Sequence, residues 1–187
     1  TVQNIHIPGA HNIENILAVI ALTYSLGVAP EVIYEGIATF TGVEHRLERL
    51  DTIDGVTYYN DSKATNVDSA VKALEAFDKP VILLAGGHDK MTDLSDFMEL
   101  VRVKTKQVIF MGEARSRFTE EAMKQGVSNI HQAQSMKEAV QLGKQLATAG
   151  DIVLLSPACA SYDWYSCFEE RGEDFKREVH ALKGGAL

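Results

Sequence analysis

The chain has 187 residues, of which 45% are hydrophobic and 24% are charged, and its formal net charge at pH 7 is -8. These fractions are typical of an ordinary globular protein, and the length allows one large domain or one domain with an appendage. The acidic balance argues against nucleic acid as a partner, while a few local cations would still suffice to bind an anionic substrate.

The cysteines and the lack of targeting signals indicate the cellular setting. Cys159 and Cys167 lie close together in the sequence without metal-type companions, which favours a reduced, cytoplasmic compartment. The sequence contains no signal peptide and no apolar run long enough to cross a membrane. It begins at Thr1 rather than at Met, and its opening residues lead straight into a polar, site-like segment at residues 7–12, so we expect a fragment of a longer protein. We also expect the protein to be a monomer.

Two helices are predicted ahead of the first strand. Residues 12–26 have a broad apolar face, with Asn12 as the expected cap and Gly27 as the expected stop. A second helix is predicted over residues 31–39, behind Pro30. These two helices resemble the end of a preceding unit.

A hairpin comes next, followed by a regular alternation of helices and strands. Residues 50–60 alternate around Asp54-Gly55, which is a strong short-range hairpin signal. The expected helices cover residues 67–77, 94–103, 116–125, 135–148 and 165–182. The expected strands cover residues 81–85, 107–111, 129–131 and 151–155. Near-continuous apolar strands separated by helices predict a doubly wound, mostly parallel, Rossmann-like α/β sheet over residues 43–187.

Polar loops come directly after three of the predicted strands. They cover residues 61–65, 86–90 and 156–161. Ligands of open parallel sheets bind beyond the carboxyl ends of the strands. We therefore expect these three loops to converge on one edge of the sheet and to form a binding site there.

Several residues of these loops are candidates for ligand contact. Asp61 could bind magnesium or a nucleotide, and Lys63 could contact phosphate. Lys90 could pair with a substrate carboxylate, or it could be a solvated loop lysine. Ser161 could donate its hydroxyl to a carboxylate, cap the last helix, or do both. Gly86 could let the backbone approach a ligand closely, or it could form a tight turn.

Several other chemistries lack their sequence motifs. The chain has no G-x-x-x-x-G-K-[ST] phosphate loop, no G-x-G-x-x-G after its first strand and no G-x-S-x-G elbow. Its six histidines do not have zinc-ligand spacing. Cys159 lies between two alanines, so we interpret it as a packing residue rather than as a nucleophile.

Six segments carry a resemblance to a known family. They cover residues 8–15, 40–46, 60–66, 84–90, 155–161 and 168–175. These segments, and almost the whole chain around them, resemble the Mur ligases. The Asp-Ser-Lys-Ala-Thr run at residues 61–65 is similar to the D-glutamate-adding branch, because sister ligases typically carry an Asp with His, Asn and Pro at that position.

The resemblance implies three domains, which bind a UDP-sugar, ATP and the incoming amino acid in turn. Residues 1–42 would be the C-terminal helices of the central ATP-binding domain, and residues 43–187 would be the amino-acid-binding domain. The phosphate loop and a modified lysine that helps to hold Mg²⁺ would lie upstream in the central domain, and the missing N-terminal and central domains would be partners of this chain. The fragment alone is therefore expected to be inactive.

The implied reaction belongs to peptidoglycan precursor synthesis. ATP with Mg²⁺ phosphorylates the L-alanyl carboxylate of UDP-N-acetylmuramoyl-L-alanine, and the amine of D-glutamate then displaces phosphate. The resemblance places Asn12 and Asn15 near the nucleotide, with Asn15 toward adenine. It makes Arg46 and Asp61 ATP contacts, and it makes Lys63 a catalytic residue close to the phosphates and to D-glutamate.

The same resemblance implies a D-glutamate pocket formed by Thr65, Lys90, Ser161 and Phe168. D-Glutamate brings two carboxylates, and both need partners in a site that excludes water. Lys90 offers a charge, while Thr65 and Ser161 offer hydroxyls beside helix N-termini. Tyr162 departs from the apolar residue expected at the rim of this pocket.

Two other interpretations stay open at this point. A flavodoxin-like α/β module could hold a nucleotide or an amino acid without chemistry, and the length and acidic balance fit it equally well. A related ligase, such as a folate-glutamylating enzyme, is disfavoured by the run at residues 61–65. The three strand-end motifs favour a fragment of a D-glutamate ligase.

Overall fold

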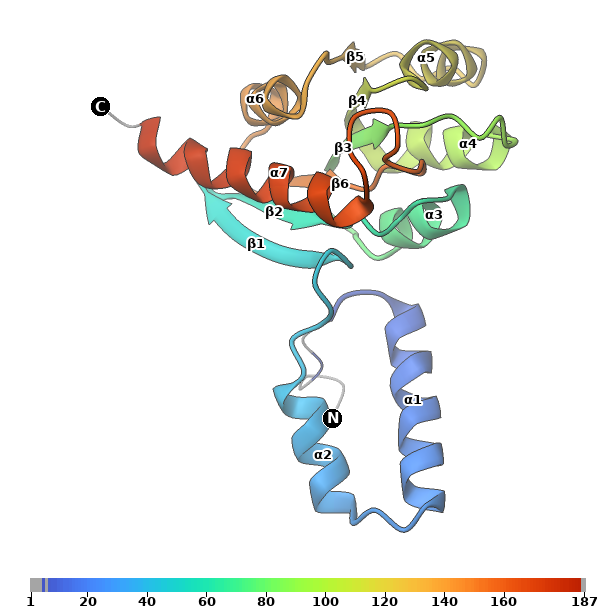
Figure 1. Ribbon diagram of the computed structural model, residues 1–187, viewed down its shortest axis with the longest axis vertical. Coiled ribbons are helices and arrows are strands. Elements are labelled where there is room, and N and C mark those ends of the chain that lie inside the picture. Colours follow the sequence, from blue (N-terminus) through green and yellow to red (C-terminus); the bar gives the residue numbers. More distant parts are fainter. Residues whose placement is uncertain (1–4, 6, 186–187) are drawn as a thin grey trace.

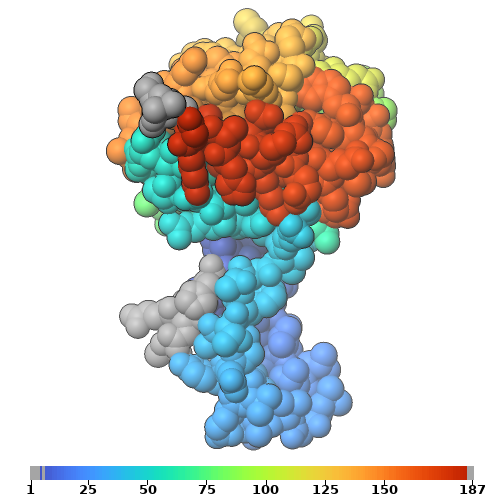
Figure 2. Space-filling model, turned by 60° about the vertical axis from the view of Figure 1, so that its left-hand side comes forward, coloured from blue at the N-terminus to red at the C-terminus, as the bar shows by residue number. Residues whose placement is uncertain are grey.

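The computed structural model describes residue 5 and residues 7–185 of the chain. Two antiparallel helices, α1 (Ala10–Ser25) and α2 (Pro30–Thr39), stand apart from a body that contains the sheet (Figure 1). The space-filling view shows the same division, with the helical pair projecting from the body (Figure 2). Residues 1–4 and 6 of the predicted first unit, and residues 186–187 of the second, lie outside the described residues.

Helix α1 begins at Ala10, two residues earlier than predicted, so Asn12 is not its cap. The N-cap is Gly9, whose φ of 99° lies in the region that favours glycine. Asn12 lies within the first turn, where its Nδ2 donates to the carbonyl of Pro8 at 2.7 Å. The cap prediction was wrong because an Asn side chain can satisfy nearby backbone groups from more than one position. Gly27 follows the helix with a φ of 83°, as its predicted role as a stop requires.

Six strands form one sheet in the order β1-β2-β6-β3-β4-β5. Their bounds are β1 (Glu48–Ile53), β2 (Val56–Asn60), β3 (Val81–Gly86), β4 (Thr105–Met111), β5 (Ile130–Gln132) and β6 (Ile152–Leu155). Strands β1 and β2 form an antiparallel hairpin, and all other neighbours are parallel. Asp54 and Gly55 turn the hairpin with φ values of 52° and 79°, the left-handed pair that such a two-residue turn requires.

The helices of the body cover both faces of the sheet. They are α3 (Val67–Glu75), α4 (Ser95–Lys104), α5 (Arg115–Lys124), α6 (Met136–Leu146) and α7 (Phe168–Ala181), followed by the 3-10 helix η2 (Leu182–Gly185). Every residue of β3 is buried, and successive side chains point to opposite faces. Helices α3, α4 and α5 lie on one side of the sheet, and α6 and α7 lie on the other (Figure 1). Leu83 belongs to the core under the first three helices, and Leu84 belongs to the core under the other two. The predicted doubly wound, mostly parallel α/β fold is confirmed.

The predicted element boundaries differ from the observed ones by up to three residues. Strand β4 starts at Thr105, earlier than predicted, because α4 runs into it without a linker. Helix α7 starts at Phe168, later than predicted, because Ser161 begins a turn in which its carbonyl accepts from the N–H of Tyr165 at 2.9 Å. Cys167 therefore occupies the N-cap of α7, and the alternative in which Ser161 caps this helix is wrong.

Gly86 and Gly87 let the chain after β3 approach other backbone segments very closely. A Cβ atom on Gly86 would lie 2.1 Å from the carbonyl oxygen of Met111, and one on Gly87 would lie 2.4 Å from that of Ala160. Their φ values of 114° and 144° also favour glycine. The close approach expected for a ligand is therefore made to the backbone of the protein itself.

Candidate functional site

Three loops follow the neighbouring strands β2, β6 and β3 and meet at one edge of the sheet. They are the β2 loop (residues 61–66), the β6 loop (residues 156–167) and the β3 loop (residues 87–94). The β2 loop is joined to the end of β6 through the N–H of Asp61, which donates to the carbonyl of Leu155 at 2.8 Å. The β3 loop is joined to the β6 loop through the N–H of His88, which donates to the carbonyl of Ala160 at 2.9 Å. The convergence predicted from the sequence is confirmed.

Two of the residues predicted to bind D-glutamate lie next to each other across these loops. Nζ of Lys90, on the β3 loop, donates to the main-chain carbonyl of Thr65, on the β2 loop, at 3.3 Å. Because β6 lies between β2 and β3, this contact spans the carboxyl end of the central strand. The ammonium of Lys90 is exposed and has three hydrogens, so it can also donate to a ligand.

Lys63 and Phe168 form a second pair at the same edge. Nζ of Lys63 lies 5.6 Å from the centroid of the Phe168 ring, within the range of a cation–π contact. Oγ of Ser62 donates to the carbonyl of Phe168 at 2.7 Å, which joins the β2 loop to the first residue of α7. The residue predicted to be catalytic therefore stands beside the start of α7.

Arg171 of α7 joins the β2 loop to the β6 loop, and it is 1% exposed. Its Nη2 and Nε donate to the carbonyl and the hydroxyl of Ser62 at 2.8 Å and 3.0 Å. Its Nη1 donates to the carbonyls of Cys159 and Ala160 at 3.0 Å and 3.1 Å. Ser161, which is 2% exposed, follows directly after these carbonyls. A buried positive charge thus fixes the backbone that carries Lys63 and Ser161.

Sequence reasoning did not single out Arg171, although the pattern contained a signal. Phe168, Arg171, Phe175 and Val179 recur at the spacing of one helix face. An arginine on such a face indicates a buried cation that needs several oxygen partners. Ser62, one of these partners, lies 109 residues away in the sequence, so it could not be identified from the pattern.

Asp61 lies inside the fold, at 5% exposure. Its carboxylate accepts from Oγ of Ser156 at 2.8 Å and from the N–H of Leu47 at 3.2 Å. Burial raises the pKa of Asp61 to about 7, and it outweighs these hydrogen bonds and the charges of Arg46 and Arg171, which lower the pKa. The carboxylate connects the β6 loop to the segment before β1, and its contact with ATP stays a prediction.

The raised pKa of Asp61 predicts a pH-dependent stability. The folded state holds the proton of Asp61 more tightly than the unfolded state, in which the pKa of this carboxyl group is 3.8. The stability that protonated Asp61 contributes to the fold is therefore fully present below about pH 4 and is lost as the pH rises through about 7. Over this interval the parent protein should lose about 4 kcal/mol relative to Asp61→Asn, which stays neutral. Urea unfolding of both proteins between pH 4 and pH 8 measures the difference, and parallel profiles would refute it.

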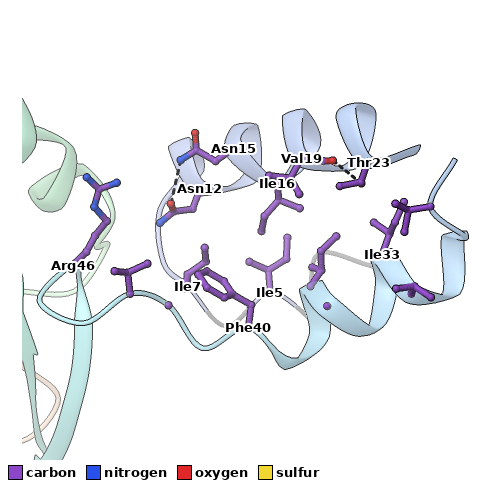
Figure 3. A pocket seen from close by; sticks show the side chains of 16 residues that line it. Ile5, Ile7, Asn12, Asn15, Ile16, Val19, Thr23, Ile33, Phe40 and Arg46 are labelled. Atoms are coloured by element: carbon purple, nitrogen blue, oxygen red, sulfur yellow. Dashed lines mark hydrogen bonds between the residues drawn. The ribbon is translucent and has the colours of Figure 1, made fainter. Parts of the chain in front are cut away.

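A pocket of about 520 Å³ lies between α1 and α2. Most of its lining is apolar, whereas Asn12, Asn15 and Arg46 lie toward the end nearest the linker between α2 and β1, which covers residues 40–47 (Figure 3). Nδ2 of Asn15 donates to Oδ1 of Asn12 at 3.4 Å. Three of the four residues predicted to bind ATP therefore line one pocket, and Asp61 is not among its described lining residues.

Glu44, His45 and Glu173 offer ligand atoms that lie within 4.8 Å of one another. Lys176 pairs with both glutamates and lies 3.1 Å from Oε1 of Glu173. Its ammonium already supplies the positive charge that a metal ion would bring. We therefore interpret this group as an ion-pair network that joins the linker before β1 to α7.

A comparison with protein families identifies the family to which a chain with these loops belongs. The family described as "Mur ligase, glutamate ligase domain" matches residues 45–159. This chain belongs to the Mur ligase family. The match covers more than half of the chain and includes the β2 loop, the β3 loop and the start of the β6 loop. The resemblance expected from the motifs is confirmed.

Curated Mur ligases of similar sequence are much longer than this chain. The UDP-N-acetylmuramoylalanine–D-glutamate ligase of Clostridioides difficile (strain 630) is 44% identical over 181 residues, which cover 97% of this chain and 40% of the relative. The ligase of the same name from Alkaliphilus metalliredigens (strain QYMF) is 46% identical over 182 residues, with coverages of 97% and 40%. The chain thus spans about 40% of the length of the curated relatives it matches.

Solved structures support the fold of this chain. UDP-N-acetylmuramate–alanine ligase from Thermotoga maritima superposes with a TM-score of 0.72 at 16% identity, over 95% of this chain and 40% of that one. Folylpolyglutamate synthase from Mycobacterium tuberculosis gives 0.66 at 17% identity, with coverages of 96% and 41%. Among the described helices, none combines the length and the hydropathy needed to span a bilayer.

Proposed function

We propose that the chain is the C-terminal part of an ATP-dependent ligase that adds D-glutamate to UDP-N-acetylmuramoyl-L-alanine during the synthesis of peptidoglycan precursors. Relatives at 44% and 46% identity bear the name of a D-glutamate ligase, which supports this assignment. One observation carries the proposal. Lys90 contacts Thr65 across the end of β6, at the same sheet edge as Lys63 and Phe168.

The proposed reaction forms an amide bond and is coupled to the cleavage of ATP. Phosphorylation converts the L-alanyl carboxylate into an acyl phosphate. The amine of D-glutamate then attacks the carboxyl carbon of this acyl phosphate, and phosphate leaves. Phosphoryl transfer depends on positioning and on cations more than on covalent help from the protein. The part assigned to this chain is to hold D-glutamate with its amine directed at the activated carboxyl group.

The polar groups at the edge of the sheet suit the two carboxylates of D-glutamate. Lys90 supplies a positive charge, and a charge-assisted hydrogen bond to a carboxylate is among the stronger contacts available. Thr65 precedes Asn66, whose side chain caps α3, so the positive end of that helix lies at the β2 loop. Ser161 supplies a hydroxyl from the β6 loop, and Phe168 supplies an apolar wall.

The pocket between α1 and α2 suits a nucleotide at its polar end. We assign Asn12, Asn15 and Arg46 to ATP, with Asn15 toward adenine. We assign Asp61 to the same side because its carboxylate accepts from the N–H of Leu47, the residue after Arg46. The phosphate loop and the groups that hold Mg²⁺ would lie upstream, since this sequence contains no such loop. Contacts from this chain would therefore complete a nucleotide site whose phosphate loop belongs to the upstream part of the central domain.

The proposed division into residues 1–42 and 43–187 would allow the two units to move relative to each other during the reaction. If the first unit belongs to the central domain, movement at the linker would bring Arg46 and Lys63 to the reacting groups only when the domains close. Closure would also exclude the water that hydrolyses an acyl phosphate. We expect the isolated chain to fold, to bind D-glutamate weakly at best and to show no turnover, and measurable ligation by it would contradict this expectation.

The proposed function is tested by the amino-acid dependence of phosphate release. The full-length ligase that carries this chain is assayed with ATP, Mg²⁺ and UDP-N-acetylmuramoyl-L-alanine. Phosphate release should require D-glutamate and should be slight with L-glutamate or L-lysine. The reason is that Lys90 and the hydroxyls of Thr65 and Ser161 have one arrangement at the sheet edge, which suits one stereoisomer and two carboxylates. Equal rates of phosphate release with the three amino acids, or the same rate without any amino acid, would contradict the assignment.

A further inference from the structure

The β3 loop carries Lys90 on a segment with little regular structure. Between β3 and α4 the chain forms no helix or strand apart from an isolated bridge at His88. Lys90 and Met91 are exposed, and Met91 has a φ of 55°, which is uncommon for a residue other than glycine. A lysine on such a segment would sample many positions unless its neighbours are anchored, and ordering it on binding would then oppose affinity.

Arg117 of α5 anchors the chain on both sides of Lys90. Its Nε and Nη2 donate to the two carboxylate oxygens of Asp89 at 2.6 Å and 2.7 Å, which is a bidentate pair. Its Nη1 donates to the carbonyl of Thr92 at 3.1 Å. One guanidinium group therefore fixes the residue before Lys90 and the second residue after it.

This pair differs from an ordinary surface salt bridge. The side chains of Asp89 and Arg117 are only 10% and 22% exposed. The guanidinium also lies 5.7 Å from the ring centroid of Phe118, a core residue. Asp89 accepts a further hydrogen bond from the N–H of Met91 at 2.9 Å. Exposed ion pairs contribute little to stability because solvent screens their charges and their side chains stay mobile. The pair of Asp89 and Arg117 is largely shielded from solvent, and both side chains are held by further contacts.

We propose that Asp89 and Arg117 are positioning residues for amino-acid recognition, which fix the β3 loop so that Lys90 meets a substrate carboxylate opposite Thr65. The inference rests on the proposed function, because it takes the ligand of Lys90 to be D-glutamate. Arg117 acts through Lys90, since all three of its guanidinium nitrogens are engaged by the loop. Its loss should weaken the binding of the amino acid and spare that of ATP.

The test compares Arg117→Met with Lys124→Met in the full-length ligase. Lys124 lies on the same helix and pairs with Glu121 at 2.7 Å, so this control also removes an ion pair from α5 but leaves the β3 loop intact. Arg117→Met should raise KM for D-glutamate about tenfold, with kcat and KM for ATP within about twofold of the parent. Arg117→Lys should recover only part of this loss, because an ammonium group cannot hold Asp89 in bidentate fashion and reach Thr92 as well.

Two further variants make the outcome decisive. Asp89→Asn weakens the same contact from the loop side and should raise the same KM, which provides an independent measurement if Arg117→Met folds poorly. In a protein that already carries Lys90→Ala, Arg117→Met should add no further loss. A KM for D-glutamate equal to that of Lys124→Met, or a fully additive loss in the double variant, would overturn the positioning role. Unchanged D-glutamate binding in Lys90→Ala alone would instead overturn the proposed function.

Discussion

Replacing Arg171 by Met should lower the free energy of unfolding by about 3–5 kcal/mol. Methionine has a similar length and fills most of the same space, so the loss comes from the missing donors rather than from a cavity. The carbonyls of Ser62 and Cys159 would stay buried without the hydrogen bonds that Arg171 donates to them. Each buried acceptor left unsatisfied costs about 1–3 kcal/mol.

Arg177 provides the matched control for this substitution. It lies on the same helix, its side chain is 68% exposed, and it pairs with Asp174 on the surface. Arg177→Met should therefore change the free energy of unfolding by less than about 1 kcal/mol. Urea denaturation of both variants gives the comparison, and a loss in Arg171→Met no larger than that in Arg177→Met would show that the loops are held together by other contacts.

In the full-length ligase, Lys90→Ala should raise KM for D-glutamate by roughly tenfold to a hundredfold. A charge-assisted hydrogen bond contributes about 1.5–3 kcal/mol, and each 1.4 kcal/mol corresponds to about a factor of ten in affinity. Lys90 is exposed and donates to the carbonyl of Thr65 across an open edge of the sheet, so its removal should leave the stability of the fold almost unchanged. The effect should therefore fall on substrate binding.

Two companion variants show whether charge at this position is what matters. Lys137, on α6, is exposed and lies on a helix that contributes no loop to the candidate site, so Lys137→Ala should leave KM unchanged. Lys90→Arg keeps the charge and should retain much of the affinity, although its planar fork has a different reach. Steady-state kinetics with varied D-glutamate measures all three, and equal constants for Lys90→Ala and Lys137→Ala would remove Lys90 from the site.

Most of the fold could be predicted because its signals are local. The runs that form β3 and β6 are apolar along their whole length, which indicates strands buried on both faces without knowledge of their partners. The Asp54-Gly55 pair predicted the hairpin because the turn needs two residues that tolerate positive φ. The edge of the sheet at which the loops meet could then be predicted from the direction of the parallel strands alone.

The errors and omissions concern side chains whose partners are set by tertiary structure. Asn12 was predicted to be a cap from its residue type, and a cap was one alternative for Ser161. Asn12 instead lies in the first turn of α1, and Ser161 begins a turn that precedes α7. Arg171 and Arg117 were overlooked because they bind oxygens of residues remote in the sequence, with Ser62 lying 109 residues from Arg171 and Asp89 lying 28 residues from Arg117. A charged residue at a core-facing helix position signals such a contact but does not name its partner.

A crystal structure of the full-length ligase with D-glutamate bound tests the central claim most directly. The distances to be measured are those from the carboxylate oxygens of D-glutamate to Nζ of Lys90 and to the hydroxyls of Thr65 and Ser161. We expect one carboxylate within hydrogen-bond distance of Lys90 and of at least one of these hydroxyls, beside the ring of Phe168. D-Glutamate bound away from the β2, β3 and β6 loops would contradict the assignment of this sheet edge as the amino-acid site.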